Sequence, residues 1–139
     1  MGKSINVKDF IRALKRANRK QVYGRLFALD KKTDEVCGCA LGQGLIEYGI
    51  VTEDEVRAEL QKSGTPAGYK VFDPATNTVE DRNMLVNSAW EVGFSGVLDE
   101  LNNQLPGFTS QVISSNDSNK LTIPQILSKF WDRWLPNGL

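Results

Sequence analysis

Residues 35–48 constrain the fold of this chain more than any other stretch, because they form its longest run with few charges. The run begins with strand-like residues, continues with small ones and ends in apolar ones. Leu41 and Leu45 recur at helical spacing, which places them on one face. Gly42 and Gly44 have no Cβ, so another element can approach the backbone closely. We therefore predict a buried strand that leads into a buried helix, with the rest of the chain packed around both.

Length and charge bound the class of protein. A chain of 139 residues that is 40% hydrophobic can bury the core of one domain without disulfides or metal. Its 17 basic and 17 acidic side chains cancel, which argues against nucleic acid as the main partner, because proteins of that class carry a basic excess. The chain shows no signal peptide and no apolar run near the roughly 18 residues that cross a bilayer. We predict a single domain over residues 1–139, cytoplasmic and without a membrane contact.

The cysteines Cys37 and Cys39 are expected to be reduced in a cytosol, and a disulfide between residues so close in sequence would be strained. The sequence contains no histidine, so a tetrahedral zinc site would need carboxylates as its remaining ligands. Free cysteine is among the most buried residue types. We predict that both cysteines are core residues, and we predict no metal and no cofactor.

Four helices carry start or stop signals. Asn6 caps a first helix, whose apolar residues follow at spacings of three and four. Gly49 supplies a left-handed cap at the end of the central helix. Thr52 and Thr122 each stand three residues before a glutamate or glutamine, which is the spacing of a capping box, so each begins a further helix.

The remaining segments give the fold class. Residues 21–30 are rich in β-branched and aromatic residues and predict a strand that pairs with residues 35–37. Residues 69–79 predict a second, more exposed hairpin. Apolar spacing predicts a helix from Met84 to Gly93, and residues 116–119 are a turn by composition. The sequence thus predicts an α+β fold, mainly helical, with one or two short antiparallel β-hairpins.

No catalytic residue is predicted. Without histidine the commonest general base is missing, and neither cysteine has an imidazole to activate it. The glycines of the central stretch match neither the dinucleotide-binding nor the P-loop spacing. The sequence favours a protein that is not an enzyme.

A small polar ligand, such as a nucleotide, would find its contacts in basic and amide side chains. The candidates are Arg16, Arg19, Arg25, Asn116 and Asp117, provided that folding brings them together. The alternative for the arginines is an ordinary solvated helix face, and the alternative for Asp117 is a turn or a cap.

A protein partner would find its contacts on the last predicted helix. Its wide apolar stripe contains Phe130, Trp131 and Trp134, which either close the core or leave a tryptophan for a partner. Buried aromatic residues dominate interface energetics, so these three are the predicted partner contacts. Self-pairing of this aromatic end in a homo-oligomer is left open.

The segment Cys37-Gly38-Cys39-Ala40-Leu41-Gly42, followed far downstream by Ser115-Asn116-Asp117 and a helix capped by Thr122, resembles a loose group of small phage and actinobacterial proteins. Members of that group show a Cys-x-Gly-Ala-Leu-like segment, a distant Asn-Asp, and a helix opened by threonine or serine.

The resemblance implies a phage origin and a binding role toward a host protein or other host factor in the host cytoplasm. The alternative, which rests on the basic and Asn-Asp candidates above, is a protein that binds or sequesters a nucleotide-like molecule, for example in counter-defence, with hydrolysis of that molecule as the less favoured form. Because the helix start and the Asn-Asp recur together in the group, Asn116 or Asp117 is expected either to cap its turn into the Thr122 helix or to bond backbone within residues 39–42.

Overall fold

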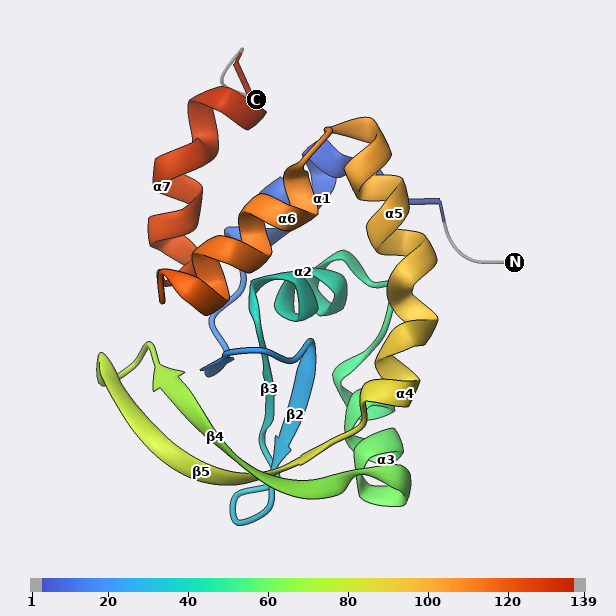
Figure 1. Ribbon diagram of the computed structural model, residues 1–139, viewed down its shortest axis with the longest axis vertical. Coiled ribbons are helices and arrows are strands. Elements are labelled where there is room, and N and C mark those ends of the chain that lie inside the picture. Colours follow the sequence, from blue (N-terminus) through green and yellow to red (C-terminus); the bar gives the residue numbers. More distant parts are fainter. Residues whose placement is uncertain (1–3, 137–139) are drawn as a thin grey trace.

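Five strands close into a small β-barrel in the computed structural model, which describes residues 4–136 (Figure 1). The strands are β1 (Gln21–Val22), β2 (Phe27–Asp30), β3 (Val36–Gly38), β4 (Thr65–Asp73) and β5 (Thr78–Val86), in the order β1-β3-β2-β5-β4 around the barrel. β1 pairs in parallel with β3, and the other pairs are antiparallel. The prediction of one or two separate short hairpins is therefore wrong, because the hairpins β2–β3 and β4–β5 are joined into one closed sheet, although the α+β class is right.

The helices gather at one end and along one side of the barrel (Figure 1). At the end lie α1 (Val7–Leu14), α2 (Ala40–Tyr48), α5 (Ser95–Gln104), α6 (Phe108–Ile113) and α7 (Ile123–Trp134), and at the side lie α3 (Glu53–Ser63) and α4 (Ser88–Glu91). A 3-10 turn, η1 (Val92–Phe94), joins α4 to α5, and a π-helical turn, η2 (Ser114–Ser118), continues α6. Within residues 4–136, no helix is long and apolar enough to cross a membrane.

Strand alternation divides the apolar side chains between two cores. Along β2, Ala28 points into the barrel, where it meets Cys37 and Met84. Phe27 and Leu29 point the other way and join the larger core beneath the helices. The predicted buried strand and helix at residues 35–48 are confirmed, since β3 and the first six residues of α2 are buried between these cores.

The predicted helix caps are confirmed. The side chain of Asn6 accepts a hydrogen bond from the N–H of Asp9, and both threonine capping boxes are complete at Thr52 and Thr122. Gly49 ends α2 at a φ of 98°, a conformation that favours glycine. Cys37 and Cys39 are free thiols buried in the two cores, as predicted.

The helix predicted from Met84 to Gly93 is wrong over its first half. Met84 and Val86 lie on β5, with their side chains buried in the barrel, and a helix starts only after Asn87, which caps α4. The spacing of apolar residues here imitates a helix, but pairing with β4 along the whole of β5 determines the conformation.

Two other segments also differ from the prediction. The strand predicted over residues 21–30 is broken at Gly24, whose φ is 86°, so that β1 pairs with β4 while β2 pairs with β5. The turn predicted at residues 116–119 is largely π-helical, because η2 runs to Ser118.

Candidate functional site

The start of α2 is held by a buried asparagine from the far end of the chain. Cys39 is the N-cap of α2, but its side chain makes no capping hydrogen bond. Instead, Oδ1 of Asn116 accepts from the N–H of Ala40 at 3.0 Å and from Nε2 of Gln21 at 2.8 Å. The expected bond between the Asn-Asp pair and the backbone near Cys39 is therefore confirmed.

The amide nitrogen of the Asn116 side chain also makes both of its possible hydrogen bonds. Nδ2 of Asn116 donates to the carbonyl of Val22 at 3.2 Å and to Oδ1 of Asp117 at 2.7 Å. Asn116 thus makes the four hydrogen bonds that a primary amide can make, and it is 1% exposed. It has no polar position left for a ligand, so its role in the structure is to join β1, α2 and η2.

Asp117 and Arg25 each make a hydrogen bond that involves the loop between β1 and β2. Oδ1 of Asp117 accepts from the N–H of Gly24 at 2.9 Å. The next residue, Arg25, donates from Nε to the hydroxyl of Tyr69 at 2.9 Å. Both candidate ligand residues therefore help to fix the conformation of this loop.

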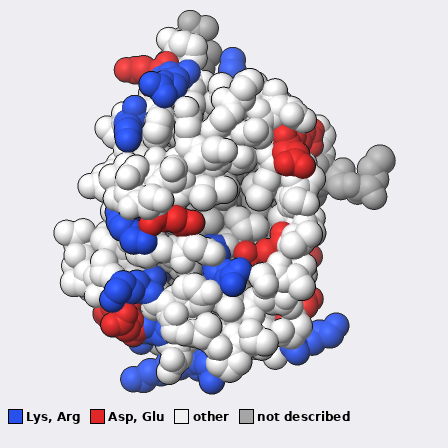
Figure 2. Space-filling model, viewed as in Figure 1, with Lys and Arg blue, Asp and Glu red and all other residues white. Residues whose placement is uncertain are grey.

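The same loop is also tied to α4. The carboxylate of Glu91 accepts from the N–H of Leu26 at 3.1 Å, and burial raises the pKa of Glu91. Figure 2 shows the face of the molecule seen in Figure 1, with a hollow near its middle and acidic and basic side chains at the lower edge of that hollow.

The thiol of Cys39 lies at the N-terminus of α2, a place where helices often activate cysteine. Here burial raises the pKa of Cys39 to about 12, and the negative charges of Asp117 and Glu91 act in the same direction. Burial likewise raises the pKa of Cys37 to about 12. Both groups are therefore held as neutral thiols in this structure.

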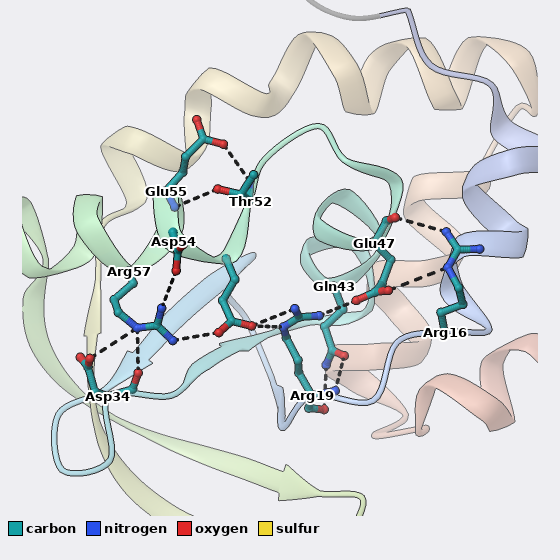
Figure 3. Close-up of polar contacts among 10 residues, drawn as sticks. Arg16, Arg19, Asp34, Gln43, Glu47, Thr52, Asp54, Glu55 and Arg57 are labelled. Carbon is teal, nitrogen blue, oxygen red and sulfur yellow. Dashed lines mark hydrogen bonds and ion pairs between the residues drawn. The ribbon is translucent and has the colours of Figure 1, made fainter.

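Arg16 and Arg19 belong to a separate network of charges (Figure 3). Arg19 donates from Nη1 to Glu47 at 2.6 Å and from Nη2 to Glu53 at 2.9 Å. Arg16 donates to the backbone carbonyl of Glu47 and lies 3.9 Å from its carboxylate. Arg57 extends the network from Glu53 toward the β2–β3 turn.

This network joins the segment between α1 and β1 to α2 and α3, and it joins α3 to the β2–β3 turn. It lies beside a polar cavity of about 660 Å³, whose lining includes both arginines Arg19 and Arg57 and their partner Glu53. Because the guanidinium groups in it already contact carboxylates, the network stabilises the fold rather than presenting free cations. The five candidate ligand residues are therefore not brought together at one site: Arg16 and Arg19 bond Glu47 and Glu53, Asn116 and Asp117 bond each other and the segment around β1, and Arg25 bonds Tyr69.

A buried glutamine that the sequence prediction missed also ties the segment before β1 to α2. Gln43 is fully buried, and its Nε2 donates to the carbonyls of Arg19, Lys20 and Gly38 while its Oε1 accepts from the N–H of Arg19. The available signal was a polar residue between two glycines in the small-residue first half of the helix.

The three aromatic residues predicted to contact a partner have different positions on α7. Phe130 and Trp134 are 8% and 3% exposed, their rings stack at 4.8 Å, and Nε1 of Trp134 donates to Gln111. Both belong to the core. Of the three, Trp131 alone packs at the edge of the core and reaches a surface groove.

The groove between α1 and α7 has a volume of about 350 Å³. Leu14, Ala17, Pro124, Leu127 and Trp131 give it apolar walls, and Lys15 and Ser128 are its polar residues. Nζ of Lys15 lies 5.1 Å from the centroid of the Trp131 ring, which is within the range of a cation–π contact. This groove is the candidate functional site, because it joins an accessible tryptophan to a cation.

Within residues 4–136, no three cysteine or acidic side chains are arranged to hold a metal ion. Comparisons of the chain with protein-family models, with curated proteins and with solved structures found no match. The resemblance to small phage and actinobacterial proteins therefore stays a prediction.

Proposed function

We propose that this protein is a non-enzymatic binding module that holds an apolar segment of a partner protein in the groove between α1 and α7. Trp131 carries the proposal, because it is the tryptophan of α7 that lines a groove rather than the core. Tryptophan is enriched among the residues that dominate binding energy at interfaces. In line with the resemblance, the proposed partner is a host protein and the proposed place of action is the host cytoplasm of a phage.

The composition of the groove indicates the chemistry of the bound segment. An aliphatic or aromatic side chain of the partner would be desolvated between Leu14, Leu127 and Trp131. Lys15 is exposed and stands over the tryptophan, so a carboxylate next to that anchor would meet its ammonium group. A groove of this size takes one or two anchoring side chains, which is typical of a transient interface.

Affinity capture from a lysate of a candidate host, followed by mass spectrometry, tests the proposal. Trp131→Ala removes the anchor and Ser128→Arg fills the groove from an exposed position. We expect both variants to lose the same captured protein.

The matched control is Ser110→Arg, an exposed position on α6 that does not line the groove. It should retain the captured protein, and circular dichroism should show that all variants are folded. An unchanged set of captured proteins in both groove variants would contradict the proposal.

A further inference from the structure

A second groove lies between α3 and the turn formed by α4 and η1. It has a volume of about 530 Å³ and is lined by Ile50, Val51, Glu55, Ala58, Glu59, Lys62, Trp90 and Phe94. Trp90 and Phe94 are half-buried, stand edge to face at 5.2 Å, and both pack on the buried ring of Phe27. The floor of the groove is therefore a rigid aromatic surface.

The floor itself is apolar surface that solvent reaches, because Trp90 and Phe94 are only half-buried and both line the groove. Val92, between them in sequence, is 67% exposed but does not line the groove. An accessible aromatic floor is typical of a surface that is covered by a partner.

The charges around this groove are mainly acidic. Glu53 and Asp54 of α3 are paired with arginines. By contrast, the carboxylates of Glu55 and Glu59 accept hydrogen bonds from Thr52 and Ser63 and, among residues 4–136, have no cation at ion-pair distance. Lys62 is the one basic residue in the lining of the groove.

The acidic character extends along the chain from α4 to η2. Residues 83–119 contain Glu91, Asp99, Glu100 and Asp117 but no lysine or arginine, whereas basic residues are concentrated near the N-terminus. Figure 2 shows the result at the upper right, where the charged side chains over α5 are acidic. A cation that approaches the groove from this side meets more acidic than basic side chains, which favours its approach.

We infer that the groove between α3 and the α4–η1 turn is a second interaction surface, and that it takes a basic, apolar segment of a partner protein. An apolar side chain of that segment packs on Trp90 and Phe94, and a lysine or arginine of the same segment pairs with Glu55 or Glu59. The sign of the charge distinguishes this surface from the groove between α1 and α7, where Lys15 favours a carboxylate.

The test uses a short, labelled amphipathic peptide of leucine and lysine, and a second peptide in which glutamate replaces lysine. Fluorescence anisotropy should show binding of the lysine peptide that weakens as salt is added, and no comparable binding of the glutamate peptide. Ala58→Lys places a cation inside the groove from an exposed helix position and should weaken binding about tenfold or more.

Ala89→Lys is the matched control, because it adds the same charge at an exposed position of α4 that does not line the groove. It should leave the affinity within about twofold, since the added charge stands outside the groove in solvent, where salt screens it. Equal effects of the two substitutions, equal binding of the two peptides, or no binding of the lysine peptide would overturn the inference. Self-association of the protein that Ala58→Lys abolishes would also overturn it, because the occupant would then be a second copy of the chain.

Discussion

Oδ1 of Asn116 accepts a hydrogen bond from the backbone N–H of Ala40 at 3.0 Å, across 76 residues of sequence. Four N–H groups at a helix start lack an intrahelical partner, and here neither the N-cap side chain nor an acidic residue in the first turn serves them. An amide from η2 takes that place. The central helix therefore depends on a segment at the other end of the chain, which makes the barrel, α2 and η2 one cooperative unit.

Replacement of Asn116 by alanine should destabilise the protein by about 2–4 kcal/mol, because it leaves the N–H of Ala40 buried without an acceptor and removes the hydrogen bonds to the side chain of Gln21 and the carbonyl of Val22. Urea unfolding followed by circular dichroism measures this change. Asn119→Ala is the control, since Asn119 is exposed and its hydrogen bond to Ser114 is made by the backbone. The control should stay within about 0.5 kcal/mol of the wild type, and an equally stable Asn116→Ala would contradict the assigned role.

The network around Arg19 predicts a stability that depends on pH. Hydrogen bonds from Arg57, and then from Arg19, lower the pKa of Glu53 from its ordinary value of 4.5. Because the folded state has the lower pKa, folding favours the ionised carboxylate. This contribution is fully present above the ordinary value and is lost as the pH falls through the lowered one.

Arg19→Gln should therefore cost about 1–2 kcal/mol at neutral pH, since Arg19 is largely covered and contacts two carboxylates. The difference from the wild type should shrink as the pH falls from 4.5 through the lowered pKa of Glu53. Urea titrations at several pH values measure it. Lys70→Gln is the control, because its ion pair with Asp81 is exposed and should contribute at most about 0.5 kcal/mol. A difference that grew at acid pH would show the opposite sign of linkage.

The two thiols should resist alkylation while the protein is folded. Burial raises the pKa of Cys37 and of Cys39 to about 12, so the reactive thiolate stays scarce at neutral and mildly alkaline pH. Mass spectrometry after iodoacetamide treatment should detect modification only when denaturant is present. Rapid modification of one cysteine in the native protein would show that its thiol is accessible and activated, and would reopen the question of a catalytic role.

Local signals account for the parts of the fold that the sequence predicts. The capping boxes at Thr52 and Thr122 depend on residues three positions apart, and the burial of α2 follows from its small and apolar residues. The closed barrel depends on pairings that are distant in sequence. β1 has only two residues, and β5 is buried only at Met84 and Val86, after a polar stretch that includes Asp81 and Asn83, so neither has the pattern of a core strand.

The candidate sites show the same division between local and distant information. Periodicity places Phe130, Trp131 and Trp134 on one wide stripe of α7, but it does not reveal how much of that stripe α1 and α6 cover. Phe130 and Trp134 are enclosed, while the edge beside α1 stays open at Trp131. The groove between α3 and η1 was equally hidden, because the sequence predicts one helix from Met84 to Gly93, whereas the structure has a strand to Val86 and then the short turn of α4 and η1 that carries Trp90 and Phe94.

Gly42 provides the sharpest test of how α2 packs on the barrel. A Cβ added there would lie 1.9 Å from the carbonyl oxygen of Leu26, and that carbonyl is itself fixed by a hydrogen bond from the N–H of Cys39. Relief of the clash needs movement of the backbone of either α2 or the loop before β2, so Gly42→Ala should cost at least about 3 kcal/mol or prevent folding.

Gly68→Ala is the matched control for this substitution. The added Cβ at Gly68 meets nothing within 4 Å, and the residue lies in β4, where alanine restricts the unfolded chain more than glycine does. Its midpoint in urea should equal or slightly exceed that of the wild type. If Gly42→Ala unfolds at the same midpoint as Gly68→Ala, α2 does not lie against the carbonyl of Leu26. The hydrogen bond from Cys39 to the same carbonyl, and with it the position of the α2 start beside Asn116, would then be in error.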